Sequence, residues 1–424
     1  MNKNNPAKIY IKRDLEIKIL PFLARKEAIS IVGPRQAGKT TFISWLSEKL
    51  KVSGKKVKLI TFEKIADLEL FQNNVEDFKS LISQYDCVII DEFQYAKEGG
   101  QKLKYLYDTT DIKFIITGSS SLDLTFQTGK YMVGRLFDFY LMPFSFREFL
   151  SYKDPELCNL LKQKITASIF DFDIRNGFGL EINKRLCSIL EKYAVFGGYP
   201  AVALSENDAE KIKILESIVE KYLLRDIKTL LNLATDDELI KLGKFLASQI
   251  GNLINYSELS NISGLSYSRL KKHIFILEKT YIINLIKPFF TNKRQELAKN
   301  PKAYFIDFGL RNYLINDFRA VELRNDKGAI MENCARIMLS NLEISREIKF
   351  WRTKSKAEVD FILEYKQNIC PVEIKYSSKR IIGKSFYSFI DKFKPEIGII
   401  LTKNYISEEK IRNTKVKFIP LSYF

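Results

Sequence analysis

The chain has 424 residues, 46% of them hydrophobic, a length that exceeds one compact core and predicts several domains. Its 68 Lys and Arg against 51 Asp and Glu give a net charge of +17, which favours a nucleic-acid partner, although solvated basic faces would give the same excess. The five scattered cysteines exclude a disulfide framework and a zinc site, and the single histidine excludes a histidine-based catalytic triad. The sequence has no long apolar run of the kind that a membrane span or a signal peptide needs. Together these features predict a cytoplasmic protein.

Residues 28–141 alternate between apolar, strand-like runs and helix-like segments. The strand-like runs span residues 28–32, 57–60, 85–90, 113–117 and 136–141. Apolar runs separated by helices are typical of parallel strands that are buried on both faces and joined by right-handed crossovers. The sequence therefore predicts a multidomain α/β fold whose first domain, residues 1–143, is built on a parallel sheet.

The segment after the first strand-like run fits the phosphate-binding pattern G-x-x-x-x-G-K-[ST]. It follows an apolar strand and precedes a helix-like run, which is the context that this loop requires. Its glycines let backbone N–H groups curl around phosphate oxygens, and the next helix directs its positive N-terminus at them. We therefore predict an ATP site in which Lys39 bridges the β- and γ-phosphates and the Thr40 hydroxyl binds Mg²⁺. The predicted nucleotide-binding residues are Gly33, Pro34, Arg35, Gln36, Ala37, Gly38, Lys39, Thr40 and Thr41.

Two carboxylates end the third strand-like run, in Val88-Ile-Ile-Asp91-Glu92. Asp91 is predicted to hold Mg²⁺, directly or through water, together with Thr40. Glu92 is predicted to polarise the water that attacks the γ-phosphate. An acidic pair at this place favours ATP hydrolysis over nucleotide binding alone.

Ser119 and Arg135 are further catalytic candidates. Ser119 follows the fourth strand-like run, with Thr117 and Ser120 as neighbours, and a polar side chain at this strand tip can orient the attacking water; the alternative is a Ser-rich turn. Arg135 precedes the fifth run. In ring-forming ATPases an arginine in this region reaches the γ-phosphate of the neighbouring subunit, and the alternative is an ordinary surface arginine. Arg135 therefore predicts self-association into a ring, of which a hexamer is one form.

These motifs give the chain a specific resemblance. The segments that carry it are GPRQAGKTT at 33–41, DEFQ at 91–94, TGSS at 117–120, GR at 134–135, PFSFREF at 143–149, FGGYP at 196–200, LRDI at 224–227, YFIDFGL at 304–310 and EVDF at 358–361. The chain resembles prokaryotic AAA-type ATPases that carry a C-terminal DUF4143 domain, and the resemblance covers nearly its whole length. It implies an AAA-like core, a helical lid, a winged-helix segment and a nuclease-like C-terminal domain.

Residues 144–240, which show helical periodicity, are predicted to form the lid, and residues 241–300 the winged-helix segment. In the latter, a capped helix from Ser257 and a turn at 264–266 precede a second helix at 267–279, which has an apolar stripe. The residues predicted to contact DNA from that helix are Tyr267, Ser268, Arg269, Lys271 and Lys272. The alternative is a winged helix that serves only as a contact between domains or subunits. His273 is interpreted as structural.

Residues 301–424 are predicted to form the C-terminal domain. A helix at 327–342 is followed by three strands, another helix and a strand, an αβββαβ order similar to the core of PD-(D/E)xK nucleases. The predicted strands span 348–352, 358–363, 369–375 and 397–401.

The alternation of side chains along these strands predicts a second metal site. Glu358 and Asp360 should share one face of their strand, with Val359, Phe361 and Leu363 on the other. Glu373 and Lys375 should likewise share a face. Asp360, Glu373 and Lys375 would then meet and bind one or two Mg²⁺ for phosphodiester cleavage, with Glu332 as a further ligand. The alternative is an inert structural or DNA-docking domain.

The sequence thus favours an ATP-hydrolysing AAA-type ATPase that binds and remodels branched or duplex DNA. One alternative is an ATP-gated, metal-dependent DNA endonuclease. Another is an ATPase that acts on a protein partner in signalling or defence.

Overall fold

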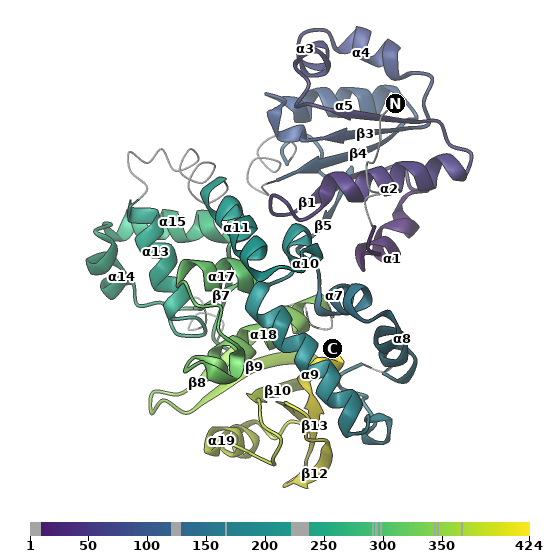
Figure 1. Cartoon of the computed structure of the whole chain (residues 1–424). Helices are drawn as coiled ribbons and strands as arrows, with labels where there is room; N and C mark the ends of the chain where they lie inside the picture. Colours follow the sequence, from purple (N-terminus) through teal and green to yellow (C-terminus); the bar gives the residue numbers. More distant parts are fainter. Residues whose placement is uncertain are drawn as a thin grey trace. The chain divides into compact units, whose positions relative to one another are not determined.

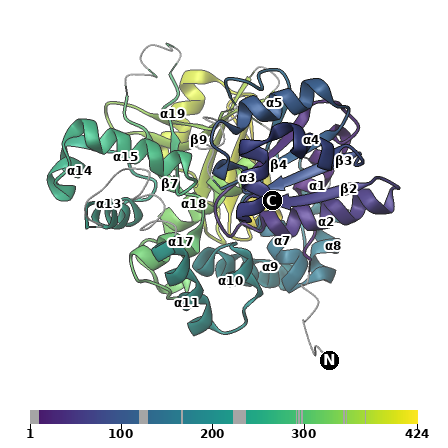
Figure 2. The same ribbon diagram turned by 90° about the horizontal axis from the view of Figure 1, so that it is seen from above.

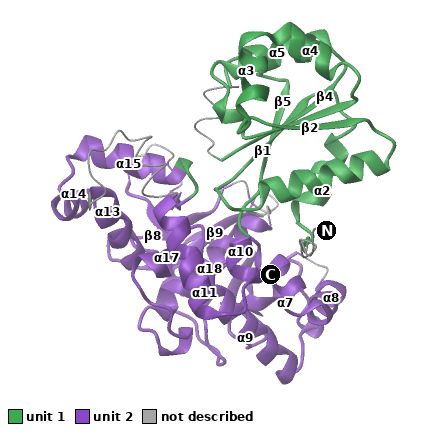
Figure 3. Cartoon of the chain, turned by 45° about the horizontal axis from the view of Figure 1, so that its top comes forward, with its two compact units in different colours: residues 1–143, 279–281 green, residues 144–278, 282–424 purple. Residues whose placement is uncertain are grey.

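The computed structural model describes residues 10–119, 129–165, 168–221, 237–290, 292, 296, 299–342, 345, 347–365 and 368–424. They form two compact units, residues 1–143 with 279–281 and residues 144–278 with 282–424 (Figure 3). The predicted lid, helix-turn-helix and C-terminal segments thus share one unit, and their division into three domains stays a prediction. Ser120 and the segment 224–227 lie outside the described residues.

The first unit is built on a five-stranded sheet. Its strands are β1 (Ala28–Val32), β2 (Val57–Thr61), β3 (Cys87–Asp91), β4 (Lys113–Gly118) and β5 (Leu136–Tyr140). All neighbouring strands are parallel, in the order β2-β3-β4-β1-β5. The predicted parallel sheet is confirmed, and each strand begins and ends within two residues of its predicted bounds.

Helices cover both faces of this sheet. They are α1 (Leu15–Ile19), α2 (Lys39–Val52), α3 (Ile65–Asn73), α4 (Val75–Ile82) and α5 (Gly99–Thr109). Figure 1 shows α3, α4 and α5 on one face and α1 and α2 on the other. Ile29 and Ile31 of β1 pack with Phe42 of α2, whereas Val32 packs with Phe71 of α3. Alternate residues of a strand point to opposite faces, so a strand covered on both sides is apolar throughout.

The second unit begins with helices. They are α7 (Phe146–Lys153), α8 (Pro155–Lys164), α9 (Leu180–Phe196), α10 (Pro200–Leu204), α11 (Asp208–Ile218), α13 (Asp237–Ser248), α14 (Tyr256–Ser263), α15 (Tyr267–Lys279) and α17 (Phe308–Leu314). Figures 1 and 2 show α13, α14 and α15 side by side. The two-stranded sheet of β6 (Ile283–Ile286) and β7 (Lys302–Phe305) lies between α15 and α17 in the chain. The predicted pair of helices is present, and the strand β6 comes after it. Their identity as a winged helix stays a prediction.

The six-stranded sheet of the second unit has the order β12-β13-β11-β10-β9-β8. Its elements are α18 (Lys327–Asn341), β8 (Lys349–Arg352), β9 (Glu358–Tyr365), β10 (Asn368–Lys375), α19 (Lys384–Phe393), β11 (Ile397–Thr402), β12 (Ser407–Ile411) and β13 (Thr414–Pro420). The predicted αβββαβ order is present, and β12 and β13 extend it.

The predicted alternation along β9 is wrong at Phe361. Val359 and Ile362 both pack with the α19 side chains Phe386 and Phe389, whereas Phe361 packs against Tyr304 of β7, with ring centroids 5.7 Å apart. The pairing of β8 with β9 shifts register between Lys349 and Trp351. An extra residue in one strand reverses the facing of the side chains beyond it.

Three of the motif segments meet within the second unit. The buried Asp307 carboxylate accepts hydrogen bonds from the N–H groups of Gly198, at 2.7 Å, and Leu310, at 3.1 Å. A methyl group at Gly309 would stand 2.1 Å from the Phe196 carbonyl oxygen. The Phe144 N–H donates to the Gly198 carbonyl at 2.7 Å. The segments 143–149, 196–200 and 304–310 therefore hold one another through their backbones, which gives these motifs a structural role.

Two expectations from composition can also be compared with the structure. All five cysteines are buried and free of disulfides. Within the described ranges, no helix is both long and apolar enough to cross a bilayer.

Candidate nucleotide site and acidic cluster

The predicted ATP-site residues converge at the carboxyl edge of the first unit's sheet. In parallel strands all carboxyl ends lie at one edge, and ligands of open α/β sheets bind there. Val32, at the end of β1, is paired with Gly118, at the end of β4. The loop that begins at Gly33 therefore starts beside Ser119.

The phosphate-binding loop has the tight backbone that its glycines permit. Gly38, just before α2, has a φ of 94°, a left-handed conformation that favours glycine. A methyl group at Gly33 would stand only 2.0 Å from the carbonyl oxygen of Leu141, the residue after β5. The loop therefore lies directly against the chain that leaves β5, and a side chain at Gly33 cannot be accommodated without backbone movement.

Lys39 lies folded into this loop. Its Nζ donates hydrogen bonds to the carbonyl oxygens of Gly33 and Pro34, both at 2.9 Å. Burial lowers the pKa of Lys39 to about 8, against the opposing charges of Glu92 and Asp91. Among the described residues, no carboxylate forms a hydrogen bond with this buried ammonium. Lys39 therefore suits an anionic ligand such as a triphosphate, which would offset the cost of its desolvation.

Thr40 and Asp91 form a pair suited to Mg²⁺. The Thr40 hydroxyl donates to Asp91 Oδ2 at 2.8 Å, and the Thr117 hydroxyl donates to Asp91 Oδ1. Asp91 is buried. Hydroxyl and carboxylate oxygens are hard ligands that Mg²⁺ prefers, usually with several waters and phosphate oxygens. The donor set therefore fits the predicted metal.

Glu92 lies beside the pair and is held by polar neighbours. The Ser119 hydroxyl donates to Glu92 Oε2 at 3.1 Å, and the Gln94 side-chain amide donates to the same oxygen. Glu92 has a φ of 56°, left-handed for a residue with a side chain. Such backbone strain persists where the surroundings fix it, often at functional sites. Here the Glu92 N–H also donates to the Thr117 hydroxyl at 3.2 Å.

Arg135 lies at the opposite edge of the sheet. It immediately precedes β5, whose first residue, Leu136, pairs with Ala28 at the start of β1. Five strand residues span roughly 15 Å, so the loop that begins at Gly33 is that far away. Among described residues, Arg135 pairs with Asp108 at 3.2 Å. Arg135 therefore cannot act on the ATP site of its own chain.

Arg13 is a residue at this site that the sequence reasoning missed. Its buried guanidinium donates to the carbonyl oxygen of Ala37 in the phosphate-binding loop, at 3.0 Å, and to that of Met142, at 2.5 Å. Arg13 thereby ties the loop to the end of the first unit. No local pattern marks it, because its partners are backbone groups distant in sequence.

The predicted residues of the second metal site are brought together in the second unit, but as ion pairs. Glu373 Oε1 lies 2.7 Å from Lys375 Nζ. The Asp360 carboxylate accepts the Ile374 N–H at 2.8 Å. Glu332, on α18, accepts the Tyr304 hydroxyl at 2.5 Å. Burial, reinforced by the Glu332 charge, raises the pKa of Asp360 well above its ordinary value.

A second lysine, which the sequence reasoning missed, neutralises this cluster. Lys302 Nζ lies 3.1 Å from Glu332 Oε1 and 2.6 Å from Glu358 Oε1, and its side chain is 1% exposed. Burial alone would lower the pKa of Lys302, but Glu332 and Glu358 raise it above its ordinary value. A charged lysine thus lies among the carboxylates.

The cluster does not fit the predicted metal. Among the residues that the structure describes, no three His, Cys, Asp or Glu side chains are placed to hold one ion. One buried oxygen, Glu373 Oε2, has no hydrogen-bond partner, as an unfilled ligand would. Glu332, however, is paired with Lys302 and accepts the Tyr304 hydroxyl, although its charge also acts on Asp360. The role of Glu332 as a metal ligand is therefore not supported.

The predicted DNA-contact helix presents its polar face to solvent. Leu270, Ile274 and Leu277 of α15 are buried. The residues exposed on the same helix include all those predicted to contact DNA, Tyr267, Ser268, Arg269, Lys271 and Lys272. His273 is buried, and its Nδ1 lies 2.7 Å from the Arg269 carbonyl oxygen, in keeping with a structural role.

Family models match three parts of the chain. A model described as an AAA domain matches residues 25–150, and a domain of unknown function, DUF4143, matches residues 327–424. Another domain of unknown function, DUF8612, matches residues 188–320, which includes the helix-turn-helix segment.

Relatives of similar length are uncharacterized proteins. One from Methanocaldococcus jannaschii is 25% identical, over 89% of this chain and 81% of its own. One from Haemophilus influenzae is 22% identical, over 97% of this chain and 98% of its own.

Among solved structures, AMPPCP-bound DnaA from Aquifex aeolicus has 15% identity and a TM-score of 0.29, covering 62% of this chain and 85% of its own. The ADP form of the Aeropyrum pernix ORC2 protein has 14% identity and a TM-score of 0.33, covering 80% of this chain and 96% of its own. Similarities of this size carry no conclusion about this chain.

Proposed function

We propose that this chain, which combines an AAA domain with a C-terminal DUF4143 domain, hydrolyses ATP with Mg²⁺ and uses the energy to act on DNA. The observation that carries the first half is the convergence, at one sheet edge, of a buried lysine in a phosphate-binding loop with Thr40, Asp91, Glu92 and Ser119. These supply an anion cradle, hard oxygen ligands and a general base.

Each residue has a distinct role in this mechanism. Lys39 leaves the carbonyl oxygens of Gly33 and Pro34 and contacts the β- and γ-phosphates. Thr40 and Asp91 would hold Mg²⁺, which would neutralise phosphate charge when bound. Glu92 accepts a proton from the attacking water, and Ser119, which now donates to Glu92, orients that carboxylate or the water itself.

Arg135 supports a ring. Its position at the opposite sheet edge fits a role at the site of a neighbouring copy, where an arginine can stabilise charge that develops on the γ-phosphate. The test measures ATP binding and turnover in an Arg135→Ala variant, together with the size of the assembly that it forms in the presence of ATP. We expect normal ATP binding and turnover that falls at least a hundredfold; turnover equal to that of wild type would refute the role.

DNA is proposed as the load because of charge and shape. The net charge is +17, and the exposed face of α15 carries three basic side chains beside Tyr267 and Ser268. Helices of this kind contact the major groove, and basic side chains neutralise backbone phosphates.

One experiment tests both halves. ATP turnover is measured without DNA and with duplex, branched and single-stranded DNA, in wild type, Lys39→Ala and a Lys271→Gln/Lys272→Gln variant. We expect DNA to stimulate turnover, Lys39→Ala to abolish it, and the double variant to lose stimulation while keeping basal turnover. If no DNA binds at low salt or changes turnover, DNA is not the load, and a protein partner is favoured instead.

A further inference from the structure

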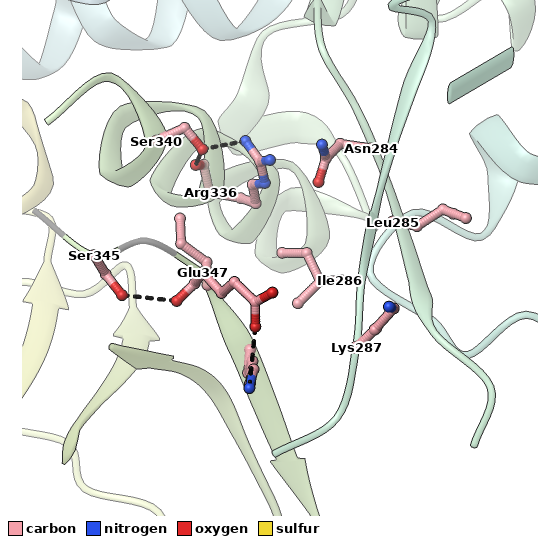
Figure 4. Close-up of a pocket in the computed structure, with 10 residues that line it drawn as sticks. Asn284, Leu285, Ile286, Lys287, Arg336, Ser340, Ser345 and Glu347 are labelled. Carbon is pink, nitrogen blue, oxygen red and sulfur yellow. Dashed lines mark hydrogen bonds and ion pairs between the residues drawn. The ribbon is translucent and has the colours of Figure 1, made fainter. Parts of the chain in front are cut away.

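The second unit contains a cavity of about 560 Å³ that none of the proposed functions uses. Figure 4 shows it between the β6 strand, α18 and the segment that leads into β8. Its lining is mixed, with polar side chains on every wall. The lining residues are Asn284, Leu285, Ile286, Lys287, Arg336, Ser340, Ser345, Glu347, Ile348 and Lys349.

Arg336 of α18 is the central feature of this cavity. Its Nη1 donates to the Ser340 hydroxyl one helical turn later, as Figure 4 shows. Its Nε is buried and has no hydrogen-bond partner in the part of the chain that the structure describes. Among described residues no carboxylate forms an ion pair with it, and the acidic groups that raise its pKa from further away are Tyr304 and Glu278. Burial lowers the pKa of Arg336 to about 10, so it remains a cation at neutral pH.

Arg336 is half-buried, and two fully buried arginines of the same unit are neutralised. Arg311 lies 2.7 Å from Asp326, and Arg324 lies 2.9 Å from the same carboxylate. A buried charge without a partner costs several kcal/mol, roughly, unless something compensates it. Arg311 and Arg324 face the carboxylate of Asp326, whereas Arg336 faces the cavity.

The remaining charges of the lining do not supply that compensation. Glu347 is paired with Lys349, 3.1 Å away, rather than with Arg336. Lys349 also lies 2.8 Å from Glu296. Lys287 is exposed at the cavity and adds a second positive charge. The lining therefore presents an excess of positive charge together with hydroxyl and amide groups.

We propose that this cavity binds a phosphate group, held by Arg336 with Lys287 and the hydroxyl and amide groups of Ser340 and Asn284. A guanidinium directs several N–H donors in one plane at phosphate oxygens, and neutral donors complete the shell. The cavity lies in the second unit and its lining includes none of the ATP-site residues, so it is distinct from that site. It does not require that DNA be the load.

The test is a calorimetric titration of the full chain with inorganic phosphate, in wild type, Arg336→Gln and Arg336→Lys. The matched control is Arg380→Gln, which removes an exposed arginine of the same unit that pairs with Glu409 at 2.8 Å. Phosphate that binds in the phosphate-binding loop is identified by its loss in Lys39→Ala. We expect Arg336→Gln to weaken phosphate binding at least tenfold, Arg336→Lys to weaken it less, and Arg380→Gln to leave it unchanged.

A thermal melt separates binding from folding. Without phosphate, Arg336→Gln should melt at or above the wild-type temperature, because it removes an uncompensated charge. Phosphate should then raise the melting temperature of wild type more than that of Arg336→Gln. The proposal would be overturned if Arg336→Gln and wild type bound phosphate with equal affinity. It would also be overturned if both Arg336 variants were unfolded whether or not phosphate was present.

The source of the phosphate group is distinguished with duplex DNA that carries or lacks a 5′-phosphate. If the cavity binds a backbone phosphodiester, Arg336→Gln should bind both duplexes more weakly and to the same extent. The slope of the logarithm of affinity against the logarithm of salt concentration should then be smaller by about one. A terminal phosphate predicts weakening of the 5′-phosphorylated duplex alone. Loss of inorganic phosphate binding without any change toward DNA identifies a free phosphate compound, and leaves the proposed DNA function to its own test.

Discussion

Replacing Lys302 by Met should destabilise the second unit in a way that depends on pH. Lys302 is 1% exposed and lies within 3.1 Å of Glu332 and 2.6 Å of Glu358. Methionine keeps an unbranched side chain of nearly the same length but leaves partly buried carboxylates without an ammonium. Removing one partner of a buried ion pair typically costs about 3–5 kcal/mol. Glu358 keeps Arg352, so about one carboxylate is left uncompensated.

Proton uptake limits this loss. Protonating a glutamate of ordinary pKa near 4.3 at pH 7 costs about 3.7 kcal/mol, at 1.36 kcal/mol per unit, and at pH 5.5 about 1.6 kcal/mol. The folded variant binds a proton that its unfolded chain lacks, so its stability relative to wild type rises as pH falls. We expect a loss of about 3–4 kcal/mol at pH 7 that shrinks to about 1.5 kcal/mol at pH 5.5.

The assay is urea unfolding followed by the fluorescence of Trp351, a buried residue of the second unit, in a Trp45→Phe background that silences the first unit. Adding Glu332→Gln to Lys302→Met should recover part of the loss. Lys184→Met, which removes an exposed pair with Glu181 in the same unit, should change nothing measurable. A loss that stays constant between pH 7 and 5.5, or no loss at all, would refute the assignment of Lys302 as the counter-charge of this cluster.

Three further predictions follow from the two units. Glu92→Gln should keep ATP affinity within a few-fold and lower turnover by about 10²–10⁴, because it removes the general base; measured turnover near the wild-type rate would assign that role elsewhere. Gly33→Ala should destabilise the first unit by at least about 1–3 kcal/mol, because its methyl group would stand 2.0 Å from the Leu141 carbonyl oxygen. Chemical unfolding measures this loss, and Gly54→Ala is the control variant, because a methyl group at Gly54 meets nothing within 4 Å, although the φ of Gly54 is +87°. Burial raises the pKa of Asp307 from 3.8 to about 6, so the folded state binds more protons than the unfolded chain. Wild type should therefore lose up to about 3 kcal/mol of stability relative to Asp307→Asn as pH rises from 4 to 6.5. A stability difference between the two proteins that does not vary with pH contradicts this prediction.

The sheet of the first unit could be predicted closely because its central strands β1, β3 and β4 are buried on both faces. Their sequences are mostly apolar, and β1 begins and ends where the sequence indicates. The ATP site followed, because the phosphate-binding loop, Asp91 and Glu92 all occupy ends of these strands. The edge strand β12, Ser407–Ile411, was missed because its sequence SEEKI is dominated by polar residues.

The acidic cluster could be predicted only in part, because its outcome depends on contacts distant in sequence. Asp360, Glu373 and Lys375 were found from a short pattern. Nothing near residue 302 indicates that a lysine is buried there, and the carboxylates that retain it lie 30 and 56 residues further on. The register shift that turns Phe361 toward Tyr304 likewise depends on the pairing of β8 with β9.

The placement of Lys39 and Arg135 at opposite edges of one sheet has a consequence for mixed assemblies. If copies associate head to tail, each junction combines the sheet edge of one chain that holds Lys39 and the ATP site, the acceptor edge, with the sheet edge of the next chain that carries Arg135, the donor edge. A Lys39→Ala chain still offers an intact donor, and an Arg135→Ala chain still offers an intact acceptor. Two inactive proteins, once mixed, would then form some complete junctions and regain turnover by complementation. An open row of copies would always end in one silent acceptor, whereas a closed ring would have none.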